Sequence, residues 1–359
     1  MDIDKRIEVI KQVGEEIITE EDLRTLLSEK KNPIAYDGFE PSGTDIHIAQ
    51  GLLRAININK MTAAGCKFKI LVADWHAWAN NKLGGDLEKI QKAGQFYIKI
   101  WKACGLDEKN IEFVWANDII KNPSYWKIVM QVSRNSTLKR IIRCGQIMGR
   151  KEDEVMQASQ ILYPCMQCAD IFYLGVDICS LGQDQRKVNV LAMELAQRLG
   201  FKKPVAVHHH MLMGLGQPPK TGLSGVERGV ELKMSKSKPD TAIFMLDSEQ
   251  EIARKIRKAW CPEGIVDQNP ILEYFKYIIF EKFDLIIIER PEKYGGSLEF
   301  SSYKDLEEGY SKKNIHPMDL KETVSKYLNK LIAPVREAIF SNPESKKLYE
   351  EVQGFKVTR

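Results

Sequence analysis

The chain has 359 residues, of which 28% are charged and 43% are hydrophobic, and its formal net charge is +4. This length is enough for two compact domains, and the composition is that of an ordinary globular protein. No apolar run is long enough to span a membrane, and the mixed-charge start Met1–Arg6 lacks the apolar stretch of a secretory signal. We therefore expect a cytoplasmic protein with no membrane partner.

The seven cysteines are irregularly spaced and do not form a disulfide framework, which suits a reducing compartment. Cys165 and Cys168 have C-x-x-C spacing, but no second pair or matching histidines would complete a zinc site. The run His208–His210 resembles a metal-binding cluster, yet consecutive residues on a strand point to opposite faces. The sequence therefore predicts no metal site built from these side chains.

The N-terminal segment, residues 1–30, is predicted to form two short helices. A capping box formed by Thr19 and Asp22 would open the second helix. Pro33–Gly38 has the composition of a buried strand, and Glu40–Asp45 has the Pro, Ser, Gly and Asp residues of a turn. We expect the first strand of a sheet to end at this turn.

Helices and strands alternate over the next part of the chain. Residues 47–64 have helical periodicity and stop at Gly65, a natural C-terminal cap. Residues 67–74 form a predicted strand, residues 86–104 a helix capped by its first residue, and residues 111–116 a third strand. This alternation predicts an α/β fold with a Rossmann-like parallel sheet covered by helices on both faces.

The alternation of predicted strands and helices is interrupted twice further along the chain. Residues of about 119–162 read as a basic helical insertion, after which 176–181 and 204–210 return to strand character. Long helical stretches dominate beyond residue 240. We therefore predict a catalytic Rossmann-fold domain over 1–240 and a mostly helical domain over 241–359.

Two segments carry candidate phosphate-binding chemistry. His47 is predicted to begin a helix directly after a strand and turn, where unpaired backbone N–H groups and the helix dipole attract anions. Far along the chain, the loop Lys233-Met234-Ser235-Lys236-Ser237 precedes the predicted domain boundary. A flexible loop with two lysines can close over a polyphosphate and neutralise the charge that builds on a leaving diphosphate. The alternative interpretation is a solvated basic loop.

A third segment predicts a small-molecule pocket. Tyr163, Gln167 and Asp170 are spaced i, i+4 and i+7, so they share one face of an apolar helix that Pro164 can open. Polar groups on such a helix would be costly to bury without partners. They therefore indicate either a binding site or a satisfied network in the core.

The sequence resembles the class I aminoacyl-tRNA synthetases in the paired motifs His47-Ile48-Ala49-Gln50 and Lys233–Ser237. In the first motif Ala49 and Gln50 replace the usual glycine and second histidine, a relaxed form similar to that of eukaryotic tyrosyl members. The resemblance implies that ATP is a substrate. It further implies that His47, Lys233 and Lys236 are catalytic, and that Gln50 and Ser235 also bind the nucleotide.

Further motifs are similar to those of the archaeal and eukaryotic tyrosyl-tRNA synthetases, from about Glu20 to about Val335. They are Tyr36-x-Gly38-Phe39-Glu40-Pro41-Ser42-Gly43, Tyr163-Pro164-x-Met166-Gln167-x-x-Asp170 and Gly182-x-x-Gln185-Arg186-Lys187. By resemblance, Tyr36 and Asp170 would bind the phenol hydroxyl of tyrosine, and Tyr163, Gln167 and Gln185 would hold its ammonium group. Because paired polar groups would be left unsatisfied by phenylalanine, such a pocket would reject it.

The same resemblance implies surfaces for tRNA. The basic insertion would mediate homodimer formation and approach the acceptor end of the tRNA, and Tyr294-Gly295-Gly296 and His316-Pro317-Met318-Asp319 resemble anticodon-reading elements. Basic residues of the insertion also include Arg150 and Lys151. The residues that we expect to bind tRNA are Arg143, Arg186, Lys187, Tyr294, His316 and Asp319.

The resemblance therefore implies a tyrosine–tRNA ligase that makes tyrosyl-adenylate from L-tyrosine and ATP, with Mg²⁺ as counter-ion, and then charges tRNA(Tyr). A tryptophanyl-tRNA synthetase is the nearest alternative, and the pair Tyr36 and Asp170 argues against it. A small nucleotidyltransferase would leave Lys233–Ser237 and the second domain unexplained. A synthetase-derived RNA-binding protein is a third alternative, which the intact lysine loop disfavours.

Overall fold

The computed structural model describes residues 1–148, 157–223 and 225–357. Its main sheet has six strands in the order β1-β6-β5-β2-β3-β4, all parallel except β1, which pairs antiparallel with β6. The strands are β1 (Gly14–Ile18), β2 (Ile34–Phe39), β3 (Lys67–Val72), β4 (Ile111–Trp115), β5 (Ile178–Gly182) and β6 (Val205–His209). The predicted α/β fold with a parallel sheet is confirmed.

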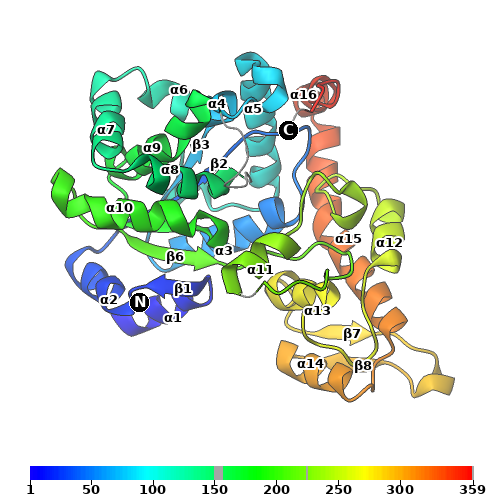
Figure 1. Cartoon of the computed structure of the whole chain (residues 1–359). Coiled ribbons are helices and arrows are strands. Elements are labelled where there is room, and N and C mark those ends of the chain that lie inside the picture. The colour runs from blue at the N-terminus through cyan, green and yellow to red at the C-terminus, as the bar shows by residue number, and fades with distance from the viewer. Residues whose placement is uncertain (149–156, 224, 358–359) are drawn as a thin grey trace.

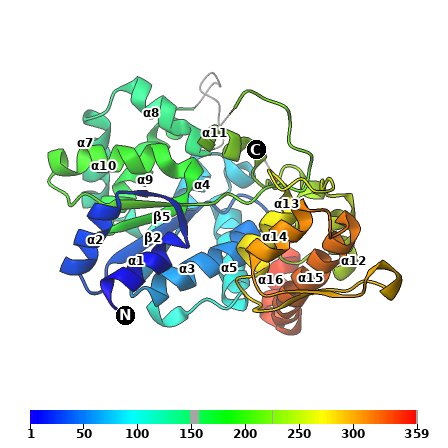
Figure 2. The ribbon, with the colours of Figure 1, turned by 90° about the horizontal axis from the view of Figure 1, so that it is seen from below.

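Helices cover both faces of this sheet, as Figure 2 shows, with α1, α3 and α5 below it and α7 to α10 above it. The helices of this part are α1 (Ile3–Lys11), α2 (Glu20–Glu29), α3 (Arg54–Ala63), α4 (Asp74–Ala79), α5 (Leu87–Ala103), α6 (Ala116–Ile119), α7 (Pro123–Arg134), α8 (Leu138–Cys144), α9 (Ala158–Tyr173), α10 (Arg186–Leu199) and α11 (Gly225–Leu232). The α/β alternation of the sequence thus becomes a three-layer arrangement.

Two hydrophobic cores lie on the two faces of the sheet because successive strand residues point to opposite sides. On β3, Ile70 faces the core shared with α3 and α5, whereas Leu71 faces the core shared with α9 and α10. On β2, Ala35 faces the first of these cores and Tyr36 faces the second. Tyr36 therefore points toward α9, the helix that carries the predicted pocket face.

The order of the strands creates a switch point between β2 and β5. From β2 the chain moves outward to β3 and β4, and it then returns to the other side of β2 to form β5 and β6. Ligands of open α/β sheets bind outside the carboxyl ends of the strands at such a point. Residues that follow β2 and β5 are therefore the ones positioned to form a site.

The rest of the chain is mostly helical and lies along the right side in Figure 1, with α16 at the top and α14 and the β7–β8 hairpin at the bottom. It contains α12 (Glu249–Lys258), α13 (Pro270–Tyr274), α14 (Tyr303–Ser311), α15 (Pro317–Ser341), α16 (Pro343–Gln353) and a hairpin of β7 (Ile286–Ile288) and β8 (Leu298–Phe300). The helices α15 and α16 pack along α5. At this junction the Lys99 ammonium lies 3.0 Å from the Glu344 carboxylate, and Phe96 contacts Tyr349.

Three local predictions differ from the structure. Residues 1–30 contain the strand β1 between their two helices, because its polar sequence is held by pairing with the distant β6. His47 lies in a short bridge opposite Phe244, and a π-helical turn, η1 (Ala49–Leu53), follows it. Pro164 lies inside α9 rather than at its start.

Candidate active site

A cleft of about 550 Å³ opens at the carboxyl ends of β2 and β5. Its walls come from these strand ends, the face of α9, the turn η1 and the loop that follows α11. All residues predicted to bind tyrosine or ATP line it, namely Tyr36, His47, Gln50, Tyr163, Gln167, Asp170, Gln185, Lys233, Ser235 and Lys236. The fold thus brings together residues from four separate segments of the sequence.

At the closed end of the cleft, the Asp170 carboxylate is fully buried. Its Oδ1 accepts a 2.9 Å hydrogen bond from the Tyr125 hydroxyl. Its Oδ2 lies 3.0 Å from Nε2 of His76, but neither atom makes a well-aligned hydrogen bond. Burial lowers the pKa of His76, but the Asp170 charge overcomes this and raises the pKa above its ordinary value. Oδ2 of Asp170 can therefore still accept a hydrogen bond in this site.

Tyr36 stands beside this carboxylate on β2. Burial, with the charge of Asp170 added, raises the pKa of the Tyr36 phenol well above its ordinary value. The hydroxyl therefore stays protonated at neutral pH and remains a hydrogen-bond donor. Sequence reasoning identified Tyr36 and Asp170 but missed Tyr125 and His76, since neither belongs to a motif or lies near α9 in the sequence.

A second group of polar side chains lies at the middle of the cleft. The side-chain amide of Gln167 donates a 3.0 Å hydrogen bond to Oε1 of Gln185, which joins α9 to the turn after β5. The Tyr163 ring packs edge-on against His76, with centroids 5.1 Å apart. The face that Tyr163, Gln167 and Asp170 share on α9 is therefore turned toward the cleft, as their spacing predicted.

His47 and Gln50 lie where the predicted phosphate site begins. His47 is buried, and its Nδ1 has no hydrogen-bond partner, as is true of Oε1 of Gln50. Burial, with the nearby charges of Lys236 and Lys233, lowers the pKa of His47 well below its ordinary value. The imidazole is therefore neutral at pH 7 and can offer one N–H donor without carrying charge.

Lys233 lines the cleft and is paired with an acidic side chain. Its ammonium donates a 2.8 Å hydrogen bond to Oδ2 of Asp184, a residue of the turn after β5. Although burial raises the pKa of the Asp184 carboxyl, Lys233 overcomes this effect and keeps the pKa below its ordinary value. Asp184 was not among the predicted site residues, because nothing in the sequence connects it with the distant lysine.

A buried ion pair supports the wall next to η1. Nε of Arg54 lies 3.0 Å from Oδ2 of Asp37, and the guanidinium also stands 5.3 Å from the centre of the Trp101 ring. Burial raises the pKa of Asp37 even though Arg54 opposes this. Nη1 of Arg54 has no hydrogen-bond partner, and Arg54 lines the cleft. This arginine is a further cation at the site that sequence reasoning missed.

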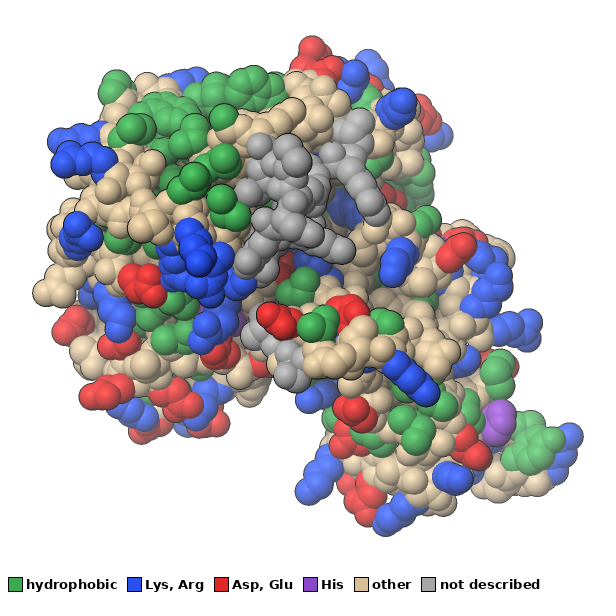
Figure 3. All heavy atoms as spheres, viewed as in Figure 1, with side chains coloured by type: hydrophobic (Ala, Val, Ile, Leu, Met, Phe, Trp, Pro, Cys, Tyr) green, Lys and Arg blue, Asp and Glu red, His purple; other side chains and the backbone are tan. Residues whose placement is uncertain are grey.

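The residues predicted to bind tRNA lie outside the cleft lining. Arg143 is exposed on α8, and Nε of Arg186 donates hydrogen bonds to both carboxylate oxygens of Glu16 at 2.9 and 3.0 Å. Lys187 follows on α10. Arg150 and Lys151 lie outside the described residues. Figure 3 shows Lys and Arg side chains gathered on the face where Figure 1 places α8 and α10.

At the far end of the helical part, two predicted elements are brought together. The Tyr294 side chain is 64% exposed in the loop between β7 and β8, and His316 caps α15. Arg290 joins these elements, since it donates to the backbone oxygens of Gly296 at 3.0 Å and Asn314 at 2.9 Å. The arginine is a connection that the sequence did not predict.

The metal-like motifs have other partners. His208 is buried between Asn189 and Glu16, at 3.0 and 2.7 Å, whereas His209 lines the cleft. Cys165 and Cys168 are buried free thiols. Over the ranges that the structure describes, no group of three His, Cys, Asp or Glu side chains is placed to hold a metal ion. Within the same ranges no helix has both the length and the apolar character needed to cross a bilayer.

Comparison with known proteins gives consistent matches over the whole chain. The profile of a family described as tRNA synthetases class I (W and Y) matches residues 28–333. Tyrosine–tRNA ligase 1, cytoplasmic, of Arabidopsis thaliana is 49% identical, with 100% of this chain and 90% of the relative covered. Tyrosine–tRNA ligase of Thermococcus kodakarensis is 43% identical, with all of both chains covered.

Solved structures give the same picture. The tyrosyl-tRNA synthetase of Pyrococcus horikoshii, complexed with L-tyrosine, superposes with a TM-score of 0.90 at 41% identity, covering 98% of this chain and 100% of that chain. A tryptophanyl-tRNA synthetase from Encephalitozoon cuniculi, bound to tryptophan, has a TM-score of 0.70 at 18% identity, with 98% and 94% covered. The second likeness is one of fold alone.

Proposed function

Because the chain belongs to the class I tRNA synthetases, and within them to the tyrosine–tRNA ligases, we propose that its cleft carries out both steps of tyrosine charging. In the first step a carboxylate oxygen of tyrosine attacks the α-phosphorus of ATP. A new O–P bond forms while the bond to the leaving diphosphate breaks, which gives tyrosyl-adenylate. In the second step a ribose hydroxyl at the 3′ end of tRNA(Tyr) attacks the tyrosyl carbonyl carbon, and AMP leaves.

The observation that carries the choice of amino acid is the buried Oδ2 of Asp170, which lies 3.0 Å from Nε2 of His76 but accepts no well-aligned hydrogen bond. This buried oxygen would accept the phenol hydrogen of tyrosine, and the Tyr36 hydroxyl beside it would complete the recognition. A buried acceptor left without a donor costs free energy, so phenylalanine in the same position would be disfavoured. Gln167, Gln185 and Tyr163 would hold the ammonium end of the amino acid.

The nucleotide would occupy the part of the cleft between His47 and the lysine loop. His47 would donate its ring N–H to a phosphate oxygen, together with Gln50, while Lys233 and Lys236 would neutralise the departing diphosphate. Ser235 lies in the same loop and would add a hydroxyl donor. No side chain acts as a nucleophile in this scheme, since catalysis comes from positioning and charge stabilisation.

We propose that Mg²⁺ enters this site as the counter-ion of the ATP phosphates. The described residues offer no cluster of carboxylates or histidines to hold it alone. Mg²⁺ commonly retains waters and binds through substrate phosphates with only one or two protein ligands. When bound, it would supply charge neutralisation to the phosphates that Lys233 and Lys236 also face.

For tRNA, we propose that the chain divides near residue 240 into a catalytic domain and an anticodon-binding domain, residues 241–359. The exposed Tyr294 ring, which has the Lys293 ammonium 4.8 Å from its centre, would stack on an unpaired base, while His316 and Asp319 at the start of α15 offer polar groups to a base edge. Arg143, Arg186 and Lys187 would contact the acceptor arm. Arg186 would then exchange its bonds to Glu16 for a phosphate.

We also propose that the protein forms a homodimer through an apolar surface near the insertion. Four large apolar side chains are exposed at this side of the molecule, on α4, α7, α8 and α9: Trp78 (46%), Met130 (57%), Leu138 (61%) and Leu162 (40%). Figure 3 shows hydrophobic side chains gathered at the upper left, where Figure 1 places α7. Exposed apolar side chains gathered on one face typically mark a protein interface.

The experiment that tests the function is ATP–diphosphate exchange with each of the standard amino acids in turn. We expect exchange only with tyrosine, followed by charging of tRNA(Tyr) transcript. Exchange with tryptophan, or with no amino acid, would contradict the proposal. His47→Ala and Lys236→Ala should each reduce the exchange rate by about a hundredfold or more, as losses of transition-state contacts do.

A further inference from the structure

We propose that Lys255 and Asp247, which lie outside the cleft, are positioning residues for adenylate formation. They hold the segment that links the lysine loop to His47. The inference rests on the proposed function, since it assumes that His47 and Lys236 bind ATP.

The segment concerned is Ala242–Asp247, directly after the lysine loop and the short turn η6 (Pro239–Thr241). It pairs with the chain around His47 through two backbone hydrogen bonds. Ile48 donates to the Ile243 oxygen at 2.9 Å, and Met245 donates to the Ile46 oxygen at 2.9 Å. The orientation of the His47 backbone is therefore set by this segment, which lies about two hundred residues away in the sequence.

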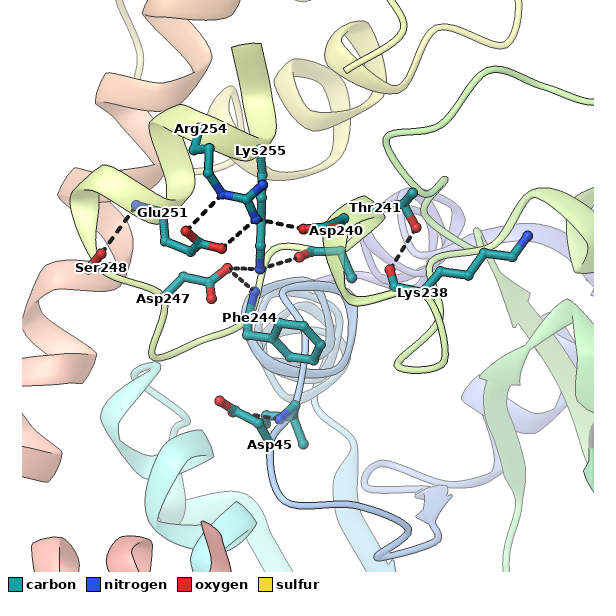
Figure 4. A network of polar contacts seen from close by, with 12 residues as sticks. Asp45, Lys238, Asp240, Thr241, Phe244, Asp247, Ser248, Glu251, Arg254 and Lys255 are labelled. Carbon is teal, nitrogen blue, oxygen red and sulfur yellow. Dashed lines mark hydrogen bonds and ion pairs between the residues drawn. The ribbon is translucent and has the colours of Figure 1, made fainter. Parts of the chain in front are cut away.

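Lys255 ties both ends of this segment together. Its ammonium, on a side chain that is only 4% exposed, donates to the Ala242 oxygen at 2.9 Å and to Oδ2 of Asp247 at 2.7 Å. The same carboxylate oxygen accepts the backbone N–H of Phe244 at 2.9 Å, and the ammonium also stands 4.8 Å from the Phe244 ring centre. Figure 4 shows the Lys255 side chain reaching from α12 into this turn.

Helices of the second domain hold Lys255 and Asp247 in place. Lys255 belongs to α12, and the backbone oxygen of Asp247 accepts a 2.7 Å hydrogen bond from Nη1 of Arg336 on α15. Arg254, also on α12, contacts Asp240 at 2.6 Å nearer the surface. The base of the lysine loop is thus attached to the domain that we expect to read the anticodon.

The buried ion pair of Lys255 and Asp247 is expected to add little to the stability of the fold, because desolvation offsets the attraction between the charges. Its geometric role here is specific, since a single ammonium fixes the backbone at Ala242 and the side chain of Asp247. Without it, the segment could shift relative to α12 while remaining packed. A displacement of about 1 Å in a catalytic group can cost about a hundredfold in rate.

The test compares Lys255→Met and Asp247→Asn with the parent in diphosphate exchange, with tyrosine affinity and melting temperature measured in parallel. We expect the exchange rate to fall by about ten- to a hundredfold, whereas the dissociation constant for tyrosine stays within about twofold because the tyrosine pocket is built on α9. Lys255→Arg should recover part of the rate. Lys258→Met, the same change at an exposed position of α12, is the matched control and should leave the rate unchanged.

A double variant, Lys255→Met with Asp247→Leu, separates positioning from stability. An apolar pair of this kind often restores the stability of a buried ion pair. The proposal requires that exchange stay slow in a double variant whose melting temperature matches the parent. Parent-like exchange in that variant, or in folded Lys255→Met or Asp247→Asn, would overturn it. If instead His47→Ala and Lys236→Ala leave exchange unchanged, the proposed ATP site itself is wrong.

Discussion

The ammonium of Lys236 donates a 2.8 Å hydrogen bond to the hydroxyl of Tyr97, which in turn donates to the backbone oxygen of Gly43 at 2.8 Å. Lys236 belongs to the lysine loop, whereas Tyr97 lies on α5 and Gly43 follows β2. The loop is therefore docked on the turn after β2. Burial in this position lowers the pKa of Lys236 to about 7, although the Asp45 and Glu40 charges oppose the shift.

A first prediction concerns protons that accompany ATP binding. Because the pKa of Lys236 is lowered to about 7, the amine is mostly uncharged at pH 8 and mostly charged at pH 6. The phosphates of ATP favour the charged form, so binding at pH 8 should take up close to one proton, and binding at pH 6 close to none. Titration calorimetry in buffers of different ionisation enthalpy measures this uptake. Lys236→Met should abolish it, whereas Lys238→Met, at the exposed lysine directly after this loop, should not.

The selection of tyrosine over phenylalanine should depend on Asp170. In Asp170→Ala the acceptor for the phenol is lost, so discrimination in diphosphate exchange should fall by about ten- to a hundredfold, the worth of about 1–3 kcal/mol for an unsatisfied buried group. Tyr125→Phe keeps the ring but removes the hydroxyl that bonds to Oδ1. It should change discrimination much less. Equal discrimination by Asp170→Ala and the parent would refute the assignment.

Gly51 should be intolerant of any side chain. A Cβ atom at this position of η1 would overlap the Met245 side chain, which is fully buried. Gly51→Ala should therefore lower the free energy of unfolding by about 1–3 kcal/mol, as overpacking does. Adding Met245→Val should recover most of the loss. Gly216→Ala, whose new Cβ would meet Thr241 at an ordinary 3.6 Å, serves as control, and denaturant unfolding gives the values.

Stability should decrease with pH because of His210. Burial lowers the pKa of His210, but Glu15 at 2.7 Å and Glu273 at 3.0 Å overcome this and raise it to about 9. The Tyr277 ring stacks on the His210 imidazole, and the Tyr277 hydroxyl donates a hydrogen bond to Glu15. Since the folded pKa is raised, the stabilisation is complete below about pH 6.5 and is lost as the pH rises through 9. It amounts to at most about 3 kcal/mol.

The measurement for His210 is a series of unfolding curves from pH 6 to pH 10. The parent should lose stability over the upper part of this range relative to His210→Gln, whose side chain does not titrate. Parallel curves for the two proteins would show that the histidine carries no such linkage.

The apolar surface near the insertion should control the oligomeric state. Leu138→Glu combined with Met130→Lys places charges where a partner would cover apolar side chains, so the protein should shift from twice the chain mass of 41.1 kDa toward the single chain mass. Leu285→Glu, at an exposed apolar residue of the helical part, is the control. Sedimentation velocity distinguishes the species. A parent protein that is already monomeric would contradict the proposed dimer.

The sequence by itself determined the fold class and most of the candidate site. Alternating strands and helices predict a parallel sheet because each pattern is local, and the i, i+4, i+7 spacing places Tyr163, Gln167 and Asp170 on one helix face whatever surrounds it. The paired phosphate motifs could be recognised for the same reason. In each case the information lies within one short segment.

Only the tertiary structure decided which partners those residues have. Tyr125 reaches Asp170 across 45 residues, and Lys236 reaches Tyr97 across 139, so no local pattern could pair them. The strand β1 likewise forms because β6 supplies its hydrogen-bond partners, against the helical character of its surroundings. Burial, ion pairing and sheet register depend on contacts between distant segments, and these contacts exist only once the chain has folded.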